Sequence, residues 1–245
     1  MFGRTIFQAT LLIFFFNLLS RLLGLVREQV IAYQFGVSAV TDAYLVAFTL
    51  PNVLFTILTG ALATVVVPVF NEYAVKGRRD EAWQLFSSVF NLVLAVLLGV
   101  TVIGGGLAPF LVKLLAPKLA PGVLALAADL ARIMFPVLVF SGLSTLFTGL
   151  LNANNIFGIT AFSGSVNNLV IIAAAMTLGE IMGIHGLAWG TTAGMAAAAL
   201  VQLPALRWAG FRYRPTAFDW RHPGVRKVFY LVLPVAIAIS INQIY

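Results

Sequence analysis

The sequence lacks several residue types on which common protein chemistry depends. It contains no cysteine, which excludes disulfides, thiolate metal sites and cysteine nucleophiles. Its only two histidines, His185 and His222, fall in expected loops, so no zinc or other metal site is predicted. Phosphate-cradling glycine loops, GxSxG, HExxH and closely spaced carboxylate pairs are also missing. We therefore expect no catalytic residues, no cofactor and no enzymatic activity.

Charge is scarce as well. Charged residues make up 9% of the 245 residues, whereas about 25% is usual in soluble domains. Hydrophobic residues make up 61%, and the mean hydropathy is +1.00. The apolar residues form long unbroken runs instead of alternating with polar ones, which argues against a β-barrel. The composition predicts an all-α polytopic membrane protein that contacts the lipid bilayer.

Seven apolar segments are long enough to span a membrane, since a spanning helix needs about 20 residues. These segments are 6–32, 41–70, 84–114, 123–151, 159–180, 184–206 and 228–245. Pro51 and Pro136 each fall inside a span and should kink it, because proline removes a backbone hydrogen bond.

The order of the segments predicts three parts. We expect a six-helix transmembrane lobe at 1–206, a cytoplasmic basic amphipathic linker with a short interfacial helix at 207–227, and the first helix of a second lobe at 228–245. Because the last apolar run stops while still hydrophobic, we expect the chain to be a fragment of a longer protein.

Basic residues gather on one side of the expected membrane. They precede the first span or follow the second and sixth: Arg4, Lys76, Arg78, Arg79, Arg207, Arg212, Arg214, Arg221, Arg226 and Lys227. Because Lys and Arg favour cytoplasmic loops, the N-terminus should be cytoplasmic. The same residues could bind anionic lipid headgroups. Nucleic acid is not an expected partner, because the net charge of +7 follows this topology pattern.

Polar residues share one face of the first expected span. At about 100° per residue, this stripe fills an arc of roughly 120° and contains Asn17, Ser20, Arg21, Gly24, Arg27 and Glu28. An arginine near a bilayer centre costs about 2.5–3.5 kcal/mol, so the stripe should face protein or a water-filled cavity. Cations in a cavity suggest an anionic cargo. The alternatives are that Arg21 bonds backbone carbonyls or Glu28, and that Arg27 snorkels to the outer interface.

The second expected span carries a facing polar stripe, formed by Asp42, Thr49, Asn52, Thr56 and Gly60. Asp42 could neutralise Arg27 or cap the helix, and neither role excludes one in gating. From the two stripes we predict Ser20, Arg21, Arg27, Asn52 and Thr56 as substrate-binding residues, with Asp42 and Glu28 as gating or counter-charge residues. Two further polar residues in the fifth span, Asn167 and Asn168, are expected to bond helix to helix.

An ordered set of short motifs carries a family resemblance, strongest from Ser20 to Tyr73. The motifs are Ser20-Arg21 with Leu23-Gly24, Arg27, Phe35-Gly36, Thr41-Asp42-Ala43, Val46-Ala47-Phe48 before Pro51-Asn52, Gly60-Ala61 and Val67-Pro68-Val69. The chain closely resembles the opening of MurJ (MviN) proteins, the presumed lipid II flippases of bacteria. The resemblance extends through Leu151-Asn152 to Asn168 and covers essentially the whole chain.

The resemblance implies the MOP exporter fold, with two six-helix lobes around a central cavity. It implies a cargo of undecaprenyl-pyrophosphate-linked disaccharide-pentapeptide, moved across the bacterial cytoplasmic membrane from the inner to the outer leaflet. It also implies cavity roles for Arg21, Arg27 and Asp42, coupling to an ion gradient or the membrane potential at a site outside this chain, and contacts with cell-wall synthesis proteins.

The sequence departs from the family pattern after Asn52. Many members carry two basic residues where this chain has Phe55 and Thr56, and an acidic residue where it has Thr59. The expected cavity is therefore less cationic than usual. This keeps a translocase for another lipid-linked oligosaccharide, of the O-antigen type, as an alternative. A cation-coupled drug exporter should show acidic cavity residues instead, and a scaffold that binds precursors without moving them is a third alternative.

Overall fold

The computed structural model describes residues 6–75, 79–211, 213 and 223–244 and contains no β-strand in these ranges. Its helices are α1 (Ile6–Phe35), α2 (Ala39–Val75), α3 (Arg79–Leu115), α4 (Pro121–Met134), α5 (Val137–Ala153), α6 (Gly158–Met182), α7 (Ile184–Leu200), α8 (Leu203–Trp208) and α9 (Pro223–Ile244). The predicted all-α architecture is confirmed.

Six helical spans in the described part of the chain are long and apolar enough to cross a membrane, and they correspond to the first six expected spans. The seventh expected segment, 228–245, lies largely within α9, which begins earlier, at Pro223. Residues 212 and 214–222 of the linker at 207–227, where a short interfacial helix is expected, lie outside the described residues. The sixth span is longer than expected, because α8 continues it after a turn at Val201 and Gln202.

The two prolines expected to kink their helices have different local surroundings. α2 remains helical through Pro51. The span Pro121–Ala153 is interrupted at Phe135 and Pro136, between the end of α4 and the start of α5. Phe135 is fully buried at this break and fits against α3 at Gly104, where a Cβ atom would overlap its ring. The absence of a side chain on Gly104 therefore lets α3 approach the α4–α5 turn.

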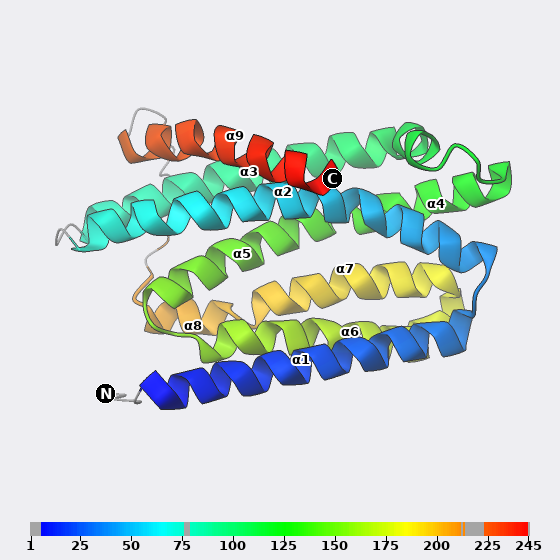
Figure 1. Ribbon diagram of the computed structural model, residues 1–245, viewed down its shortest axis with the longest axis horizontal. Helices are drawn as coiled ribbons and strands as arrows, with labels where there is room; N and C mark the ends of the chain where they lie inside the picture. The colour runs from blue at the N-terminus through cyan, green and yellow to red at the C-terminus, as the bar shows by residue number, and fades with distance from the viewer. Residues whose placement is uncertain (1–5, 76–78, 212, 214–222, 245) are drawn as a thin grey trace.

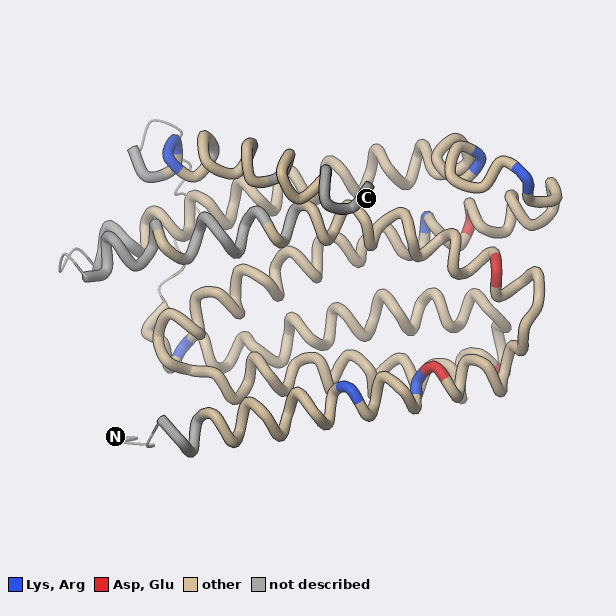
Figure 2. The backbone as a smooth tube through the Cα atoms, viewed as in Figure 1, with Lys and Arg blue, Asp and Glu red and all other residues tan. Residues whose placement is uncertain are grey.

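α1 lies at one edge of the helix bundle (Figure 1). α1 packs on α6, α6 on α7, and α7 on α5, while α2 packs on α4, α5 and α9. One buried cluster joins the first half of α3 to α5, α8 and α9. A second joins α2, the end of α3, α4, α6 and α7. Charged residues lie mostly near helix ends, and α1 is the helix that carries them nearer its middle (Figure 2).

The contact between α1 and α6 depends on a glycine that faces a serine. A Cβ built on Gly164 would lie 2.7 Å from the Ser20 Oγ and 3.6 Å from the Ser20 Cβ. A side chain at position 164 would have to displace the Ser20 hydroxyl. The position of Ser20 on α6 therefore sets the register of the polar stripe of α1.

Because the chain has no native cysteine, this register can be tested directly. We expect Ser20→Cys/Gly164→Cys to form a disulfide on mild oxidation, because the Cβ separation of 3.6 Å lies within the usual range of about 3.5–4.5 Å. Peptide mass spectrometry measures the cross-link. The control pair is Ser20→Cys/Gly179→Cys, since residue 179 lies about 22 Å further along α6 at about 1.5 Å per residue. Equal cross-linking of the two pairs would contradict the register.

Candidate functional site

The polar stripe of α1 is divided by its contact with α6. Ser20, Gly24 and Arg27 face α6: Ser20 and Arg27 form hydrogen bonds with Asn168, and a Cβ on Gly24 would lie 3.8 Å from the Asn168 Nδ2. Arg21 lies on the exposed part of α1. The stripe therefore has two different edges. Ser20, Gly24 and Arg27 pack against α6, whereas Arg21 is exposed.

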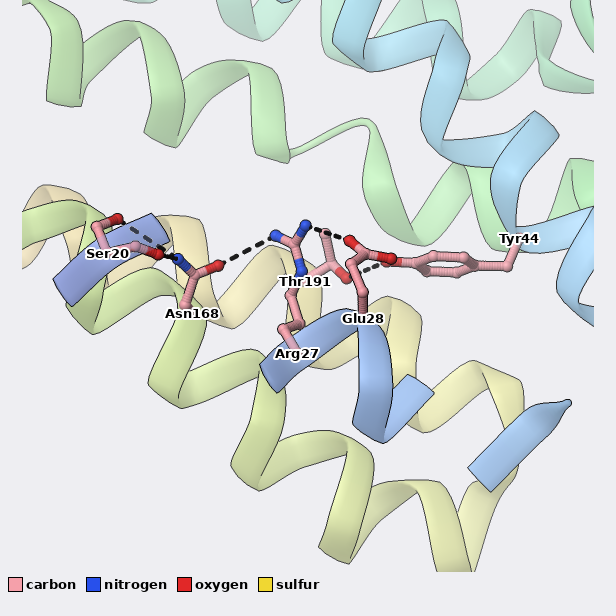
Figure 3. A network of polar contacts seen from close by, with 6 residues as sticks. All are labelled: Ser20, Arg27, Glu28, Tyr44, Asn168 and Thr191. Atoms are coloured by element: carbon pink, nitrogen blue, oxygen red, sulfur yellow. Dashed lines mark hydrogen bonds and ion pairs between the residues drawn. The ribbon is translucent and has the colours of Figure 1, made fainter. Parts of the chain in front are cut away.

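The Arg27 guanidinium lies at the centre of a network of polar contacts (Figure 3). Its Nη1 donates to the Asn168 Oδ1 at 3.1 Å, and its Nη2 forms an ion pair with the Glu28 Oε1 at 2.5 Å. The side chain of Arg27 is 29% exposed and that of Glu28 is 62% exposed. The guanidinium is thus bonded to Asn168 at one nitrogen and to Glu28 at the other, and part of the Arg27 side chain remains exposed.

Asn168 connects this arginine to the backbone of α1. Its Nδ2 donates to the Ser20 backbone oxygen at 2.9 Å and approaches the Ser20 Oγ at 3.5 Å. The side chain is buried, with 7% of the residue exposed. The prediction that Asn168 bonds helix to helix is correct, but the sequence did not indicate that its partner includes Arg27. The same prediction is not confirmed for Asn167, whose buried Oδ1 has no hydrogen-bond partner among the described residues.

A cleft of about 340 Å³ opens beside Arg27 and Glu28. Residues of α1, α2, α6 and α7 line most of it, including Asp42, Tyr44, Asn167 and Thr191. Asp42 shares this cleft with Arg27, yet the ion-pair partner of Arg27 is Glu28, and the Asp42 carboxylate has no ion pair with any described residue. Glu28, the neighbouring residue on the same helix, therefore supplies the counter-charge to Arg27. Asp42, in the first turn of α2, has no such pairing with a described residue.

A buried hydrogen bond joins two of the residues that line the cleft. Tyr44 of α2 and Thr191 of α7 are buried, and their hydroxyls are 2.9 Å apart. The Thr191 hydroxyl donates to the Leu187 backbone oxygen at 2.9 Å, so the Tyr44 hydroxyl is the donor to Thr191. This bond ties α2 to α7 across the cleft. Neither residue could be predicted from the sequence, because a lone tyrosine and a lone threonine in apolar runs carry no signal of their pairing.

The other predicted site residues are not in this cleft. Arg21 is exposed and forms no hydrogen bond or ion pair with any residue that the structure describes. Asn52 and Thr56 interact with each other within α2, where the Thr56 Oγ1 donates to the Asn52 backbone oxygen at 2.9 Å. Neither is among the residues that line the cleft. The structure therefore joins Ser20, Arg27 and Glu28 into one network and keeps Asn52 and Thr56 apart from it.

Comparisons with known proteins agree on one family and one fold. The family model described as "Lipid II flippase MurJ" matches residues 31–245. The lipid II flippase MurJ of Burkholderia cenocepacia is 34% identical over 98% of this chain and 48% of its own length. A solved structure of lipid II flippase MurJ in an inward closed conformation has a TM-score of 0.78 and 24% identity, covering 96% of this chain and 48% of the other.

The fold is shared more widely than the family. An outward-facing multidrug resistance MATE family transporter of the MOP superfamily has a TM-score of 0.75 at 13% identity, covering 95% of this chain and 52% of that one. The chain therefore shares its helical fold with about half of each of these transporters. The chain spans about half the length of the relatives it matches.

The bond between Tyr44 and Thr191 predicts an asymmetric loss of stability. We expect Thr191→Val to lower the unfolding temperature more than Tyr44→Phe, because valine leaves the buried Tyr44 donor without a partner whereas phenylalanine removes that donor. The double variant should be less destabilised than the sum of the two, with a coupling energy of about 0.6 kcal/mol, as is typical between membrane helices. Thermal unfolding in detergent measures all three, and strictly additive losses would contradict the bond.

Proposed function

Because this chain belongs to the lipid II flippase MurJ family, we propose that the protein moves lipid II from the inner to the outer leaflet of a bacterial cytoplasmic membrane. The chain supplies one lobe, and alternating access against a second lobe would expose the cargo site to each side in turn. The protein is then a multi-pass inner-membrane transporter whose partners are a lipid-linked pyrophosphate and the bilayer. Its N-terminus would be cytoplasmic, in line with the basic linker.

The observation that carries the proposal is the pair of arginines on α1. Arg21 has no partner among the described residues, and Arg27 is partly exposed beside a cleft. They are separated by about 9 Å along the helix at about 1.5 Å per residue. A pyrophosphate offers several charged oxygens, and guanidinium groups bind such oxygens in bidentate geometry. The desolvation cost of keeping two cations in an apolar helix is offset when an anion occupies the space between the lobes.

The ion pair with Glu28 would compensate the charge of Arg27 whenever no cargo is bound. Glu28 occupies one side of the guanidinium, and a diphosphate that enters from the cavity would compete with that carboxylate. Asp42, which lines the same cleft without an ion pair of its own to a described residue, could accept a cation when Arg27 exchanges partners. Cargo binding would then rearrange charge between α1 and α2. The driving force would come from an ion gradient or the membrane potential.

A second candidate cargo rests on the departure after Asn52. Phe55 and Thr56 stand where many relatives carry basic residues, so the cavity offers fewer cations for a headgroup. A translocase for another lipid-linked oligosaccharide would share the pyrophosphate and differ in the sugar. A cation-coupled drug exporter is disfavoured, because Arg21 and Arg27 would each repel a cationic drug that approached α1.

The arginine assignment predicts a loss of transport. In the complete protein, reconstituted in vesicles, we expect Arg21→Ala and Arg27→Ala each to slow lipid II translocation about tenfold or more, because a charge-assisted hydrogen bond contributes about 1.5–3 kcal/mol. Leaflet accessibility of labelled lipid II measures the rate. The matched control is Arg132→Gln on α4, which removes an arginine whose partner is Asp129, outside the cleft.

The same assay separates the rival functions. Translocation of an O-antigen-type lipid in preference to lipid II would support the second candidate cargo. Binding of lipid II without any change of leaflet would support a scaffold. If both alanine variants move lipid II at the rate of the Arg132→Gln control, the proposed role of the arginines is wrong.

A further inference from the structure

Asn168 holds two parts of α1 with the two ends of one amide. The Oδ1 accepts from Arg27 at 3.1 Å, and the Nδ2 donates to the Ser20 backbone oxygen at 2.9 Å. Because an amide offers acceptor lone pairs only on its oxygen and donors only on its nitrogen, the bond to the Ser20 carbonyl fixes which end faces Arg27. The side chain cannot be reversed without placing two acceptors together at Ser20 and two donors together at Arg27.

We propose that Asn168 is a positioning residue for the cargo site, which holds the Arg27 guanidinium in a fixed orientation without cancelling its charge. The inference rests on the proposed function and assigns a role within it. Glu28 alone would leave the arginine free to rotate, since that carboxylate is 62% exposed and adjacent on the same helix. Asn168 supplies a second, buried anchor from a different helix.

The neutrality of the anchor matters for an anionic cargo. A guanidinium has five N–H donors, and the two bonds to Asn168 and Glu28 leave donors available for a phosphate. An aspartate at position 168 would also accept a hydrogen bond from Arg27, but it would add a second negative charge beside the cargo site. It would also place a carboxylate oxygen against the Ser20 carbonyl, where the amide now donates.

The close approach of α1 to α6 is what allows this geometry. Gly164 leaves room for Ser20, and Gly24 faces the Asn168 amide, where a Cβ would lie 3.8 Å from Nδ2. The close approach at Gly164 brings the Ser20 carbonyl within reach of the Asn168 side chain, whereas a Cβ at position 24 would make an ordinary van der Waals contact with that amide. Ser20 and Arg27 lie on the same face of α1, so one side chain from α6 bonds both.

The first test measures the restraint on Arg27 without using transport. The complete protein in detergent is treated with a dicarbonyl reagent that modifies arginine, and peptide mass spectrometry reports the rate at each arginine. We expect Asn168→Leu to raise the rate at Arg27 by about tenfold or more, the range for loss of one hydrogen bond to a charged group, and to leave Arg21 unchanged. Asn168→Asp should keep Arg27 protected. The control is Thr177→Val on the same helix, whose hydroxyl bonds only the Ala173 backbone oxygen.

The labelling pattern separates positioning from general loosening. Equal increases at Arg21 and Arg27 in Asn168→Leu would mean that the substitution merely opens the bundle, and no increase at Arg27 would mean that Asn168 does not restrain it. Either result overturns the proposal. Thermal unfolding of the same samples shows whether Asn168→Leu and the Thr177→Val control remain folded.

The second test connects the restraint to lipid II movement in vesicles. We expect Asn168→Leu and Asn168→Asp both to slow translocation, the first by releasing Arg27 and the second by adding negative charge. In an Arg27→Ala background, Asn168→Leu should cause no further loss, because the residue acts through Arg27. An equal loss with and without Arg27 would overturn the proposal. If the unmodified protein does not move lipid II, the proposed function fails, while the labelling result still decides whether Asn168 positions Arg27.

Discussion

The placement of arginine in an apolar helix constrains the rest of this structure. A guanidinium in the hydrocarbon region is costly unless protein or water surrounds it, and α1 carries two. The bundle meets this constraint at Arg27 by packing α1 against α6, where the buried Asn168 amide and the neighbouring Glu28 provide partners. Arg21 is left to the exposed surface of α1, which therefore has to face other protein or a polar space.

Contacts among the other helices keep α1, α2 and α7 packed around the cleft. The interruption at Phe135 and Pro136 lets α4 and α5 pack along α2 at different points, and the buried Phe135 fits against Gly104 of α3. On the other side, Tyr44 and Thr191 join α2 to α7. Arg27 thus lies between the α1–α6 contact, where Asn168 bonds both Arg27 and the Ser20 carbonyl, and the α2–α7 contact, which the Tyr44–Thr191 bond joins.

Much of the architecture could be predicted because membrane helices follow from hydropathy alone. The first six expected spans correspond to helical spans, and the family assigned from the motifs between Ser20 and Tyr73 agrees with the family model. Helix ends and interruptions were less predictable. Pro51 and Pro136 look alike as residues within apolar runs, yet α2 continues through the first and the chain turns at the second, because the outcome depends on what packs beside each proline.

The sequence by itself determined that Arg21 and Arg27 share a polar stripe, because helical periodicity fixes the angle between residues on one helix. Only the tertiary structure decided which edge of that stripe is held and which is free. The register of α1 on α6 brings Asn168 to Arg27 although the two are far apart in the chain. Asp42 stays in the cleft with no ion pair to any residue that the structure describes. Contacts between helices depend on packing of small residues such as Gly164, and periodicity within one helix contains no information about its neighbour.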